Sequence, residues 1–161
     1  MSRARQVAVI GSSVGGNDLI EAADAVGRGL AEAGMVVVCG GLTGVMEGAA
    51  RGASAAGGTV IGIVPTSEIE DANEHCTHVV ATGIGYARNL AVVASGEAVV
   101  AVGGEWGTLS EIAFARNLGR PVIAFRSWTL TPAIDLKGGL GVTAVDDPAA
   151  AVEAVRSAIG A

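Results

Sequence analysis

Aromatic residues are scarce in this sequence, at 3% of its 161 residues, although half of the chain is apolar. This scarcity excludes a core built mainly of rings, so Ala, Val, Ile and Leu must supply the packing. The 25 glycines add small residues that let helices lie close to a sheet. A chain of this length forms one domain of ordinary size, spanning residues 1–161, with room for a full hydrophobic core.

Basic residues are also few. Ten Lys and Arg stand against 16 Asp and Glu, which gives a net charge of −6. Proteins that bind the backbone of nucleic acids need clustered Lys and Arg, so we expect no nucleic-acid partner. This charge balance still permits one anionic small molecule in a local pocket.

Long apolar runs, a signal-peptide core and a cysteine framework are missing too. We therefore expect no membrane association and a cytoplasmic location. Cys39 and Cys76 suit reduced thiols better than a disulfide. The stretch from His75 to His78 holds three potential metal ligands within four residues, which cannot easily converge on one ion, so no metal site is predicted.

Apolar runs rich in valine alternate with segments of helical character. Strands are predicted at residues 7–10, 35–39, 59–64, 78–82, 99–102 and 121–125, and helices at 18–33, 43–56, 89–94, 108–118 and 148–159. Asp147 and Pro148 favour an N-cap and a first helical position. Residues 66–77 suit a surface loop, and residues 126–141 show no clear pattern. The alternation predicts the α/β class, as a single-domain, doubly wound (Rossmann-like), mostly parallel sheet with helices on both faces.

Glycine-rich turns follow four of these strands, at residues 11–16, 40–44, 83–85 and 103–107. The carboxyl ends of parallel strands share one edge, so the turns should converge there. Free amides and the positive ends of helix dipoles favour an anion at such an edge. The first hypothesis is therefore a small phosphate-bearing ligand, bound by Gly11, Ser12, Gly40, Gly41, Thr43, Arg88, Asn89, Gly103, Gly104, Glu105, Trp106, Gly107 and Thr108.

Structural roles compete with binding at three of these places. Thr108 and Glu111 fit a capping box, in which Glu111 bonds back to the Thr108 amide, and Thr43 can cap its own helix. Arg88 lies in the first turn of a helix, where a cation is unfavourable, and its planar guanidinium matches phosphate. The alternative for Arg88 is a surface arginine paired with an acid such as Glu97.

Two familiar ligand classes do not fit these motifs. The first turn is G-S-S-V-G-G rather than G-x-G-x-x-G, and no acidic residue ends the second strand, which disfavours a dinucleotide such as NAD. A P-loop lysine motif is absent, and so is a serine elbow of the G-x-S-x-G type. A mononucleotide or another small phosphorylated cofactor remains.

Three motifs together resemble the LOG-like (LONELY GUY, formerly "lysine decarboxylase-like") Rossmann superfamily. They are Gly40 to Glu47, Arg88-Asn89, and G-G-E-W-G-T-L-S-E from Gly103 to Glu111. The resemblance covers roughly residues 6–125, and it is stronger to the branch that contains molybdenum-cofactor carrier proteins. It implies a nucleotide or molybdenum-cofactor ligand, a homodimer or higher homo-oligomer, and a phosphate loop at residues 103–108.

The same resemblance implies an alternative activity. LONELY GUY enzymes are phosphoribohydrolases that release the base from a nucleoside 5′-monophosphate, and their catalytic arginine and glutamate would correspond to Arg88 and Glu111. This sequence departs from the family pattern, because Gly103 replaces a proline and Glu105 a glycine. A carboxylate is unwelcome beside phosphate, which favours a binding or carrier protein over a hydrolase, and both remain open.

Overall fold

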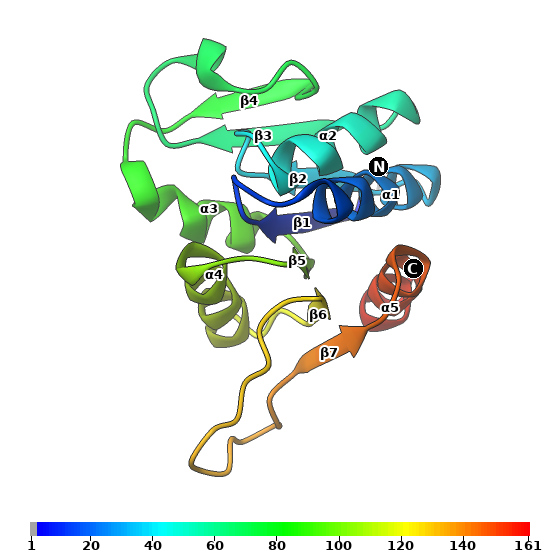
Figure 1. Cartoon of the computed structure of the whole chain (residues 1–161), viewed down its shortest axis with the longest axis vertical. Helices are drawn as coiled ribbons and strands as arrows, with labels where there is room; N and C mark the ends of the chain where they lie inside the picture. Colours follow the sequence, from blue (N-terminus) through cyan, green and yellow to red (C-terminus); the bar gives the residue numbers. More distant parts are fainter. Residues whose placement is uncertain (1–2) are drawn as a thin grey trace.

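The structure, a computed structural model describing residues 3–161, is a single α/β domain around one sheet (Figure 1). Seven strands, all parallel, lie in the order β4-β3-β2-β1-β5-β6-β7. Their bounds are β1 (Gln6–Gly11), β2 (Val36–Cys39), β3 (Val60–Val64), β4 (His78–Ala81), β5 (Ala98–Val102), β6 (Val122–Phe125) and β7 (Val142–Val145). The predicted doubly wound fold class is confirmed.

Helices cover both faces of this sheet. One layer consists of α1 (Asn17–Glu32), α2 (Val45–Ala55) and α5 (Pro148–Ile159), and the other of α3 (Arg88–Ser95) and α4 (Trp106–Asn117) (Figure 1). Two 3₁₀ turns, η1 (Ile69–Asp71) and η2 (Gly85–Ala87), flank β4. The alternating side chains of each strand enter the two cores in turn, which explains why the β5 run from Ala98 to Val102 is buried throughout.

The chain reverses its direction across the sheet between β1 and β5. It first proceeds outward from β1 to β4, and α3 then carries it back across the sheet to β5 on the other side of β1. Gly11 at the end of β1 pairs with Val102 at the end of β5. The turns that follow these strands diverge at a topological switch point, which is where open α/β sheets leave a crevice for ligands.

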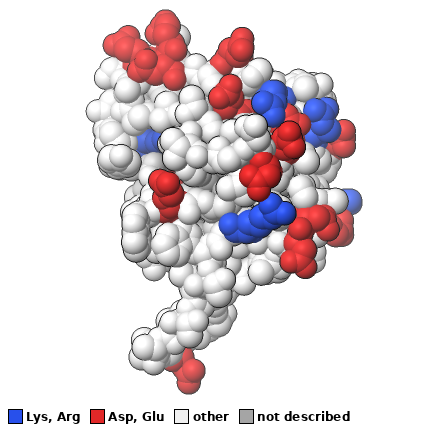
Figure 2. All heavy atoms as spheres, in the orientation of Figure 1, with Lys and Arg blue, Asp and Glu red and all other residues white. Residues whose placement is uncertain are grey.

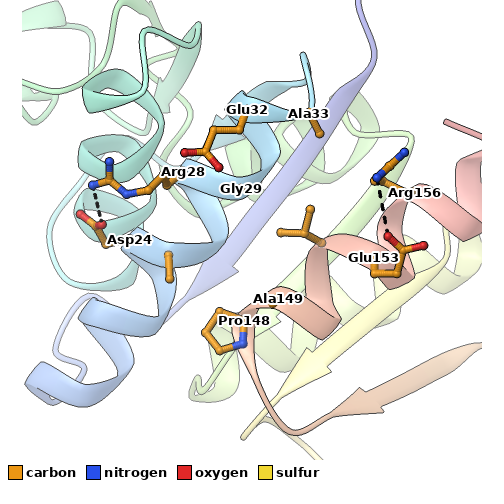
Figure 3. A pocket seen from close by; sticks show the side chains of 11 residues that line it. Asp24, Arg28, Gly29, Glu32, Ala33, Pro148, Ala149, Glu153 and Arg156 are labelled. Atoms are coloured by element: carbon orange, nitrogen blue, oxygen red, sulfur yellow. Dashed lines mark hydrogen bonds and ion pairs between the residues drawn. The ribbon is translucent and has the colours of Figure 1, made fainter.

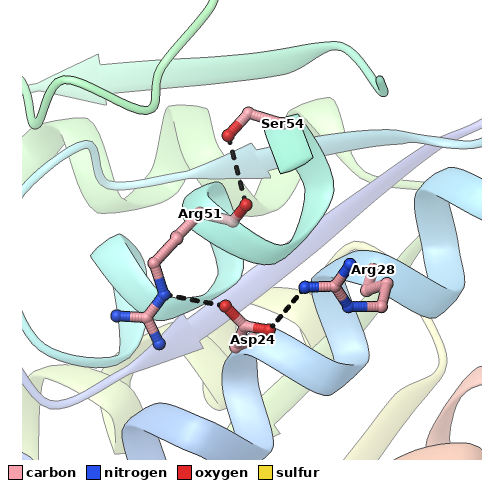
Figure 4. Close-up of polar contacts among 4 residues, drawn as sticks. All are labelled: Asp24, Arg28, Arg51 and Ser54. Carbon is pink, nitrogen blue, oxygen red and sulfur yellow. Dashed lines mark hydrogen bonds and ion pairs between the residues drawn. The ribbon is translucent and has the colours of Figure 1, made fainter. Parts of the chain in front are cut away.

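Close contact between α1 and α2 depends on glycine. A side chain at Gly27 would collide with the backbone of Ala49, and one at Gly52 with the backbone of Asp24. The Asp24 carboxylate also accepts from Arg51 Nε at 2.8 Å and from Arg28 at 3.3 Å, which ties the two helices together (Figure 4). Small residues therefore set the thickness of this layer, as the composition predicts.

Several local predictions need correction. Helix α4 begins at Trp106, two residues before the predicted start, because Glu105 already has the extended backbone of an N-cap. Thr108 is thus inside the helix and the capping box is wrong. Thr43 does not cap α2 either, since Gly44 holds the N-cap position and the Thr43 hydroxyl donates to the Ser13 carbonyl. The predicted cap at Asp147 is confirmed, with Ala150 N–H as the donor.

The segment from residue 126 to 141 projects from the body of the domain before the chain returns as β7 (Figure 1). The sequence did not indicate β7, whose exposed central residues Thr143 and Ala144 give a short edge strand little apolar signal. Figure 2 shows few charges along this projecting segment and a gathering of acidic side chains over the loop that joins β3 to β4. Among residues 3–161, no helix is both long and apolar enough to span a membrane.

Candidate functional site

A cavity of about 250 Å³ lies at the carboxyl ends of β1, β2 and β5, where the glycine turns converge. We call it the switch-point cavity. It is lined by Ile10, Gly11, Ser12, Ser13, Gly40, Leu42, Met46, Tyr86, Arg88, Asn89, Glu105, Gly107, Thr108 and Glu111. The fold thus brings together residues from turns as far apart in the chain as Gly11 and Glu111.

Arg88 is the first residue of α3 and is only 7% exposed. Its Nη1 donates a hydrogen bond to the Ile63 carbonyl at 2.7 Å, and its buried Nε has no partner among residues 3–161. Gly40 leaves the space that the guanidinium occupies, because a side chain there would collide with Arg88 Nη1. The predicted alternative of a surface arginine is wrong: Glu97 instead pairs with Arg5.

Glu111 is the second buried charge in the cavity wall, at 8% exposure on α4. Burial raises its pKa to about 7, and the nearby Arg88 guanidinium opposes that shift. Burial in turn lowers the pKa of Arg88 from its usual value, with Glu111 and Cys39 acting in the other direction. Each of the two charges therefore acts on the pKa of the other side chain, in the direction opposite to burial.

Arg88 and Glu111 nevertheless do not form an ion pair. The five pairs with an N···O distance within 4.0 Å among residues 3–161 include neither of them. Two buried, opposite charges that line one cavity without forming an ion pair are costly, since neither has a charged partner in contact to offset its loss of water. A ligand group placed between them would supply those partners.

The start of α4, beside the cavity, has free backbone amides. The first residue of α4 to bond back is Leu109, whose N–H donates to the Glu105 carbonyl at 3.0 Å, so the amides of residues 106–108 precede the helical ladder. No side chain within residues 3–161 caps α1, α2 or α4, whereas α5, which follows the edge strand β7, has its Asp147 cap. Uncapped amides and the helix dipole of α4 favour an anion here.

Eight of the thirteen predicted binding residues line the switch-point cavity, and so does Glu111. Five predicted binding residues do not line it: Gly41, Thr43, Gly103, Gly104 and Trp106. Gly103 has a φ of +56°, which proline cannot adopt, so this turn has a backbone unlike the family's proline turn. The roles of all these residues in binding are predictions that the geometry alone does not test.

Sequence reasoning missed five lining residues: Ile10, Ser13, Leu42, Met46 and Tyr86. Most are apolar or small residues, whose inward position only the fold reveals. Tyr86 did carry a signal, because it is the chain's one tyrosine and stands two residues before Arg88. It is 89% exposed, which is unusual for a large ring.

A second hollow, of about 560 Å³, lies between α1 and α5, in the layer that these helices form with α2 (Figure 3). It is larger than the switch-point cavity. Its two arginines already have carboxylate partners: Arg28 pairs with Asp24, and Arg156 with Glu153. Because these charges are satisfied and exposed, this hollow presents no buried group in need of a ligand. Residues 3–161 also hold no group of three His, Cys, Asp or Glu side chains arranged to bind a metal, and both cysteines are free.

The doubly wound sheet with a polar cavity at its switch point defines a Rossmann-like α/β protein. Residues 4–152 match the SLOG cluster4 family, and the chain belongs to that family. The resemblance to the LOG-like superfamily and its molybdenum-cofactor carrier branch, predicted from three motifs, is confirmed.

Similar proteins come from distant organisms. An uncharacterized protein of Archaeoglobus fulgidus is 40% identical over 121 residues, which is 75% of this chain and 80% of that protein. The molybdenum cofactor binding protein of Rippkaea orientalis has the same fold, with a TM-score of 0.86 and 29% identity over 98% of both chains. The molybdenum cofactor carrier protein of Chlamydomonas reinhardtii gives 0.83 and 28% over 99% of this chain and 100% of its own.

Proposed function

We propose that this protein binds a small phosphorylated molecule, a nucleotide or a molybdopterin-type cofactor, in the switch-point cavity. The observation that carries this proposal is that two buried charged residues, Arg88 and Glu111, line that cavity without forming an ion pair. Arg88 and the amides at the start of α4 suit phosphate oxygens. Glu111 suits hydroxyl or N–H donors on the sugar or the ring system.

The relatives support a binding role rather than a particular ligand. Two structures that share this fold over nearly the whole chain belong to proteins named for molybdenum cofactor binding and carriage. A molybdopterin-type cofactor combines a phosphate with a nitrogen-containing ring system, as a nucleotide does. The excess of acidic residues supports a small ligand over a nucleic acid.

Calorimetric titration with ribose 5-phosphate tests the phosphate site without involving a ring. Wild-type protein should bind it, and Arg88→Ala should bind about 10- to 100-fold more weakly, because a charge-assisted hydrogen bond to a charged group contributes about 1.5–3 kcal/mol. Arg28→Ala, which removes an exposed arginine from the α1–α5 hollow, is the matched control and should change nothing. Unchanged binding by a folded Arg88→Ala variant would overturn the proposal.

A second candidate function is hydrolysis of the N-glycosidic bond of a nucleoside 5′-monophosphate. The observation that favours it is the buried carboxyl group of Glu111, which has a pKa of about 7 and lines the same cavity as Arg88. Water would bond to C1′ of the ribose while the C1′–N bond breaks. The base would leave with the electron pair of that bond, and the proton that the water loses would end on the base. Glu111 in its carboxylate form would stabilise the positive charge that develops on the sugar.

Release of adenine from AMP, followed by chromatography, distinguishes a hydrolase from a carrier. If the protein is a hydrolase, Glu111→Gln should abolish release and keep AMP affinity within a few-fold. The carboxylate requirement also predicts that kcat/KM rises as pH passes through about 7. Normal turnover by Glu111→Gln would exclude Glu111 from catalysis, and absence of turnover by the wild type would leave the binding role alone.

A further inference from the structure

Four of the chain's five aromatic residues gather at one place. Tyr86, Trp106, Phe114 and Trp128 lie at η2, at α4 and just after β6, whereas Phe125 is buried in the sheet. Tyr86 is 89% exposed and Trp106 75%. Exposed rings of this size leave a large apolar surface without a packing partner, in a protein whose core is built of aliphatic residues.

Three of these rings line a hollow next to the switch-point cavity. We call it the aromatic groove, and define it by Tyr86, Trp106 and Phe114, with a volume of about 630 Å³. Tyr86, Asn89, Glu105 and Gly107 line both the groove and the cavity. The two hollows are therefore neighbours, and the residues that separate them line both.

Trp106, in the wall of the aromatic groove, packs against a second tryptophan. The Trp128 ring contacts the Trp106 ring with centroids 5.2 Å apart and planes tilted by 42°. Trp128 Nε1 donates a hydrogen bond to the Glu105 carbonyl at 3.1 Å, which fixes that ring to the start of α4. A ligand that stacks on Trp106 thus meets a ring that Trp128 already contacts, so fewer rotamers of Trp106 are left to lose on binding.

We propose that the aromatic groove binds the planar heteroaromatic ring of the same ligand whose phosphate lies beside Arg88. This inference rests on the proposed function and adds the class of ring. Stacking on tryptophan and tyrosine accepts any flat ring, because every such ring has a π-face. The four residues that line both the groove and the switch-point cavity favour a ring joined to a phosphate over a protein partner.

Glu105 narrows the class of ring. Glu105 lines both hollows, and its carboxylate takes part in none of the ion pairs among residues 3–161. A carboxylate only accepts hydrogen bonds, and its two oxygens match two N–H groups side by side. Guanine and pterin present such a pair, an amino group next to a ring N–H, and adenine does not. This role gives the departure from the family's glycine a reason.

Titrations with GMP, AMP, neopterin monophosphate and ribose 5-phosphate test the groove. GMP or the pterin phosphate should bind at least about tenfold more tightly than ribose 5-phosphate, and more tightly than AMP. Whichever of the two binds better identifies the source of the ring. Trp106→Ala should bring that ligand close to ribose 5-phosphate, Trp106→Phe should restore much of the difference, and neither should alter binding of ribose 5-phosphate itself. Ile134→Ala, at a residue of similar exposure (73%) on the projecting segment, is the control.

The failures of the two proposals are distinguishable. Equal affinity of the ring compounds and ribose 5-phosphate overturns the groove assignment and leaves the phosphate site standing. Equal affinity of GMP, AMP and the pterin phosphate, all above ribose 5-phosphate, overturns the role of Glu105. Loss of self-association in Trp106→Ala with unchanged ligand preference shows that the groove is an interface between copies, and contradicts the proposal. If none of the four compounds binds, the proposed function is overturned as well.

Discussion

Arg88 shows how one residue can be placed against its own preferences. It lies at the start of a helix, where the dipole is unfavourable to a cation, and its burial lowers its pKa. The Ile63 carbonyl and the space above Gly40 hold the guanidinium in this position. Such an arrangement lowers the stability of the free protein, and a bound anion is the simplest partner that would offset this loss.

Glu111 makes stability depend on pH in a predictable direction. Its pKa of about 7 in the folded state exceeds the usual 4.5, so folding favours the protonated form. Its contribution to stability is therefore full below pH 4.5, declines as pH rises, and is lost above pH 7, a total of about 3 kcal/mol. Denaturant unfolding at pH 5 and pH 8 should show this decline in wild-type protein and a weaker one in Glu111→Gln. An identical decline in both would contradict the assignment.

Glu105 supplies the sharpest test at the residue scale, because its charge should act oppositely on two ligands. Near bound phosphate, the carboxylate repels by about 1 kcal/mol after screening, so Glu105→Gln and Glu105→Gly should bind ribose 5-phosphate about fivefold more tightly. The same substitutions should weaken GMP, which loses its ring contact. Calorimetry with both ligands checks the crossover. Weaker ribose 5-phosphate binding by both variants would indicate instead that Glu105 recruits a cation.

At the scale of helices and strands, the contact between α1 and α2 depends most on residue size. Gly52→Ala would place a methyl group against the Asp24 backbone, which cannot rotate away, and we expect a loss of about 2–3 kcal/mol in the free energy of unfolding. Gly107→Ala is the helical control, since nothing lies within 4 Å of the added carbon. Chemical denaturation of the two variants makes the comparison. Equal stability of both would show that the helices separate without cost.

Six strands, five helices and their order followed from the periodicity of Val-rich runs, because buried parallel strands give the strongest apolar signal. The edge strand β7 did not follow, since its exposed residues Thr143 and Ala144 resemble a loop. The glycine turns predicted where the cavity lies. The sequence could not show that Glu105, rather than Thr108, begins α4, because only backbone geometry distinguishes a capping box from a binding loop.

At the scale of the whole molecule, some large apolar side chains remain exposed on the surface of the domain. Leu90 on α3 and Leu118 at the end of α4 are 43% and 45% exposed on the same helix layer. We expect a homodimer or a larger closed assembly, as the resemblance to the LOG-like superfamily implies, with an interface on the order of 1,600 Å². Sedimentation at micromolar concentration should show it, and Leu118→Glu should shift it toward monomer. A wild-type monomer at that concentration would defeat this expectation.

The central claim is that phosphate lies between the glycine turns and Arg88. A crystal structure of the protein with GMP tests it most directly. The account predicts the phosphate in the switch-point cavity, within hydrogen-bond distance of the Arg88 guanidinium and of the amides of Gly107 and Thr108. A phosphate bound elsewhere, such as in the hollow between α1 and α5, with Arg88 closed onto Glu111 in an ion pair, would contradict it.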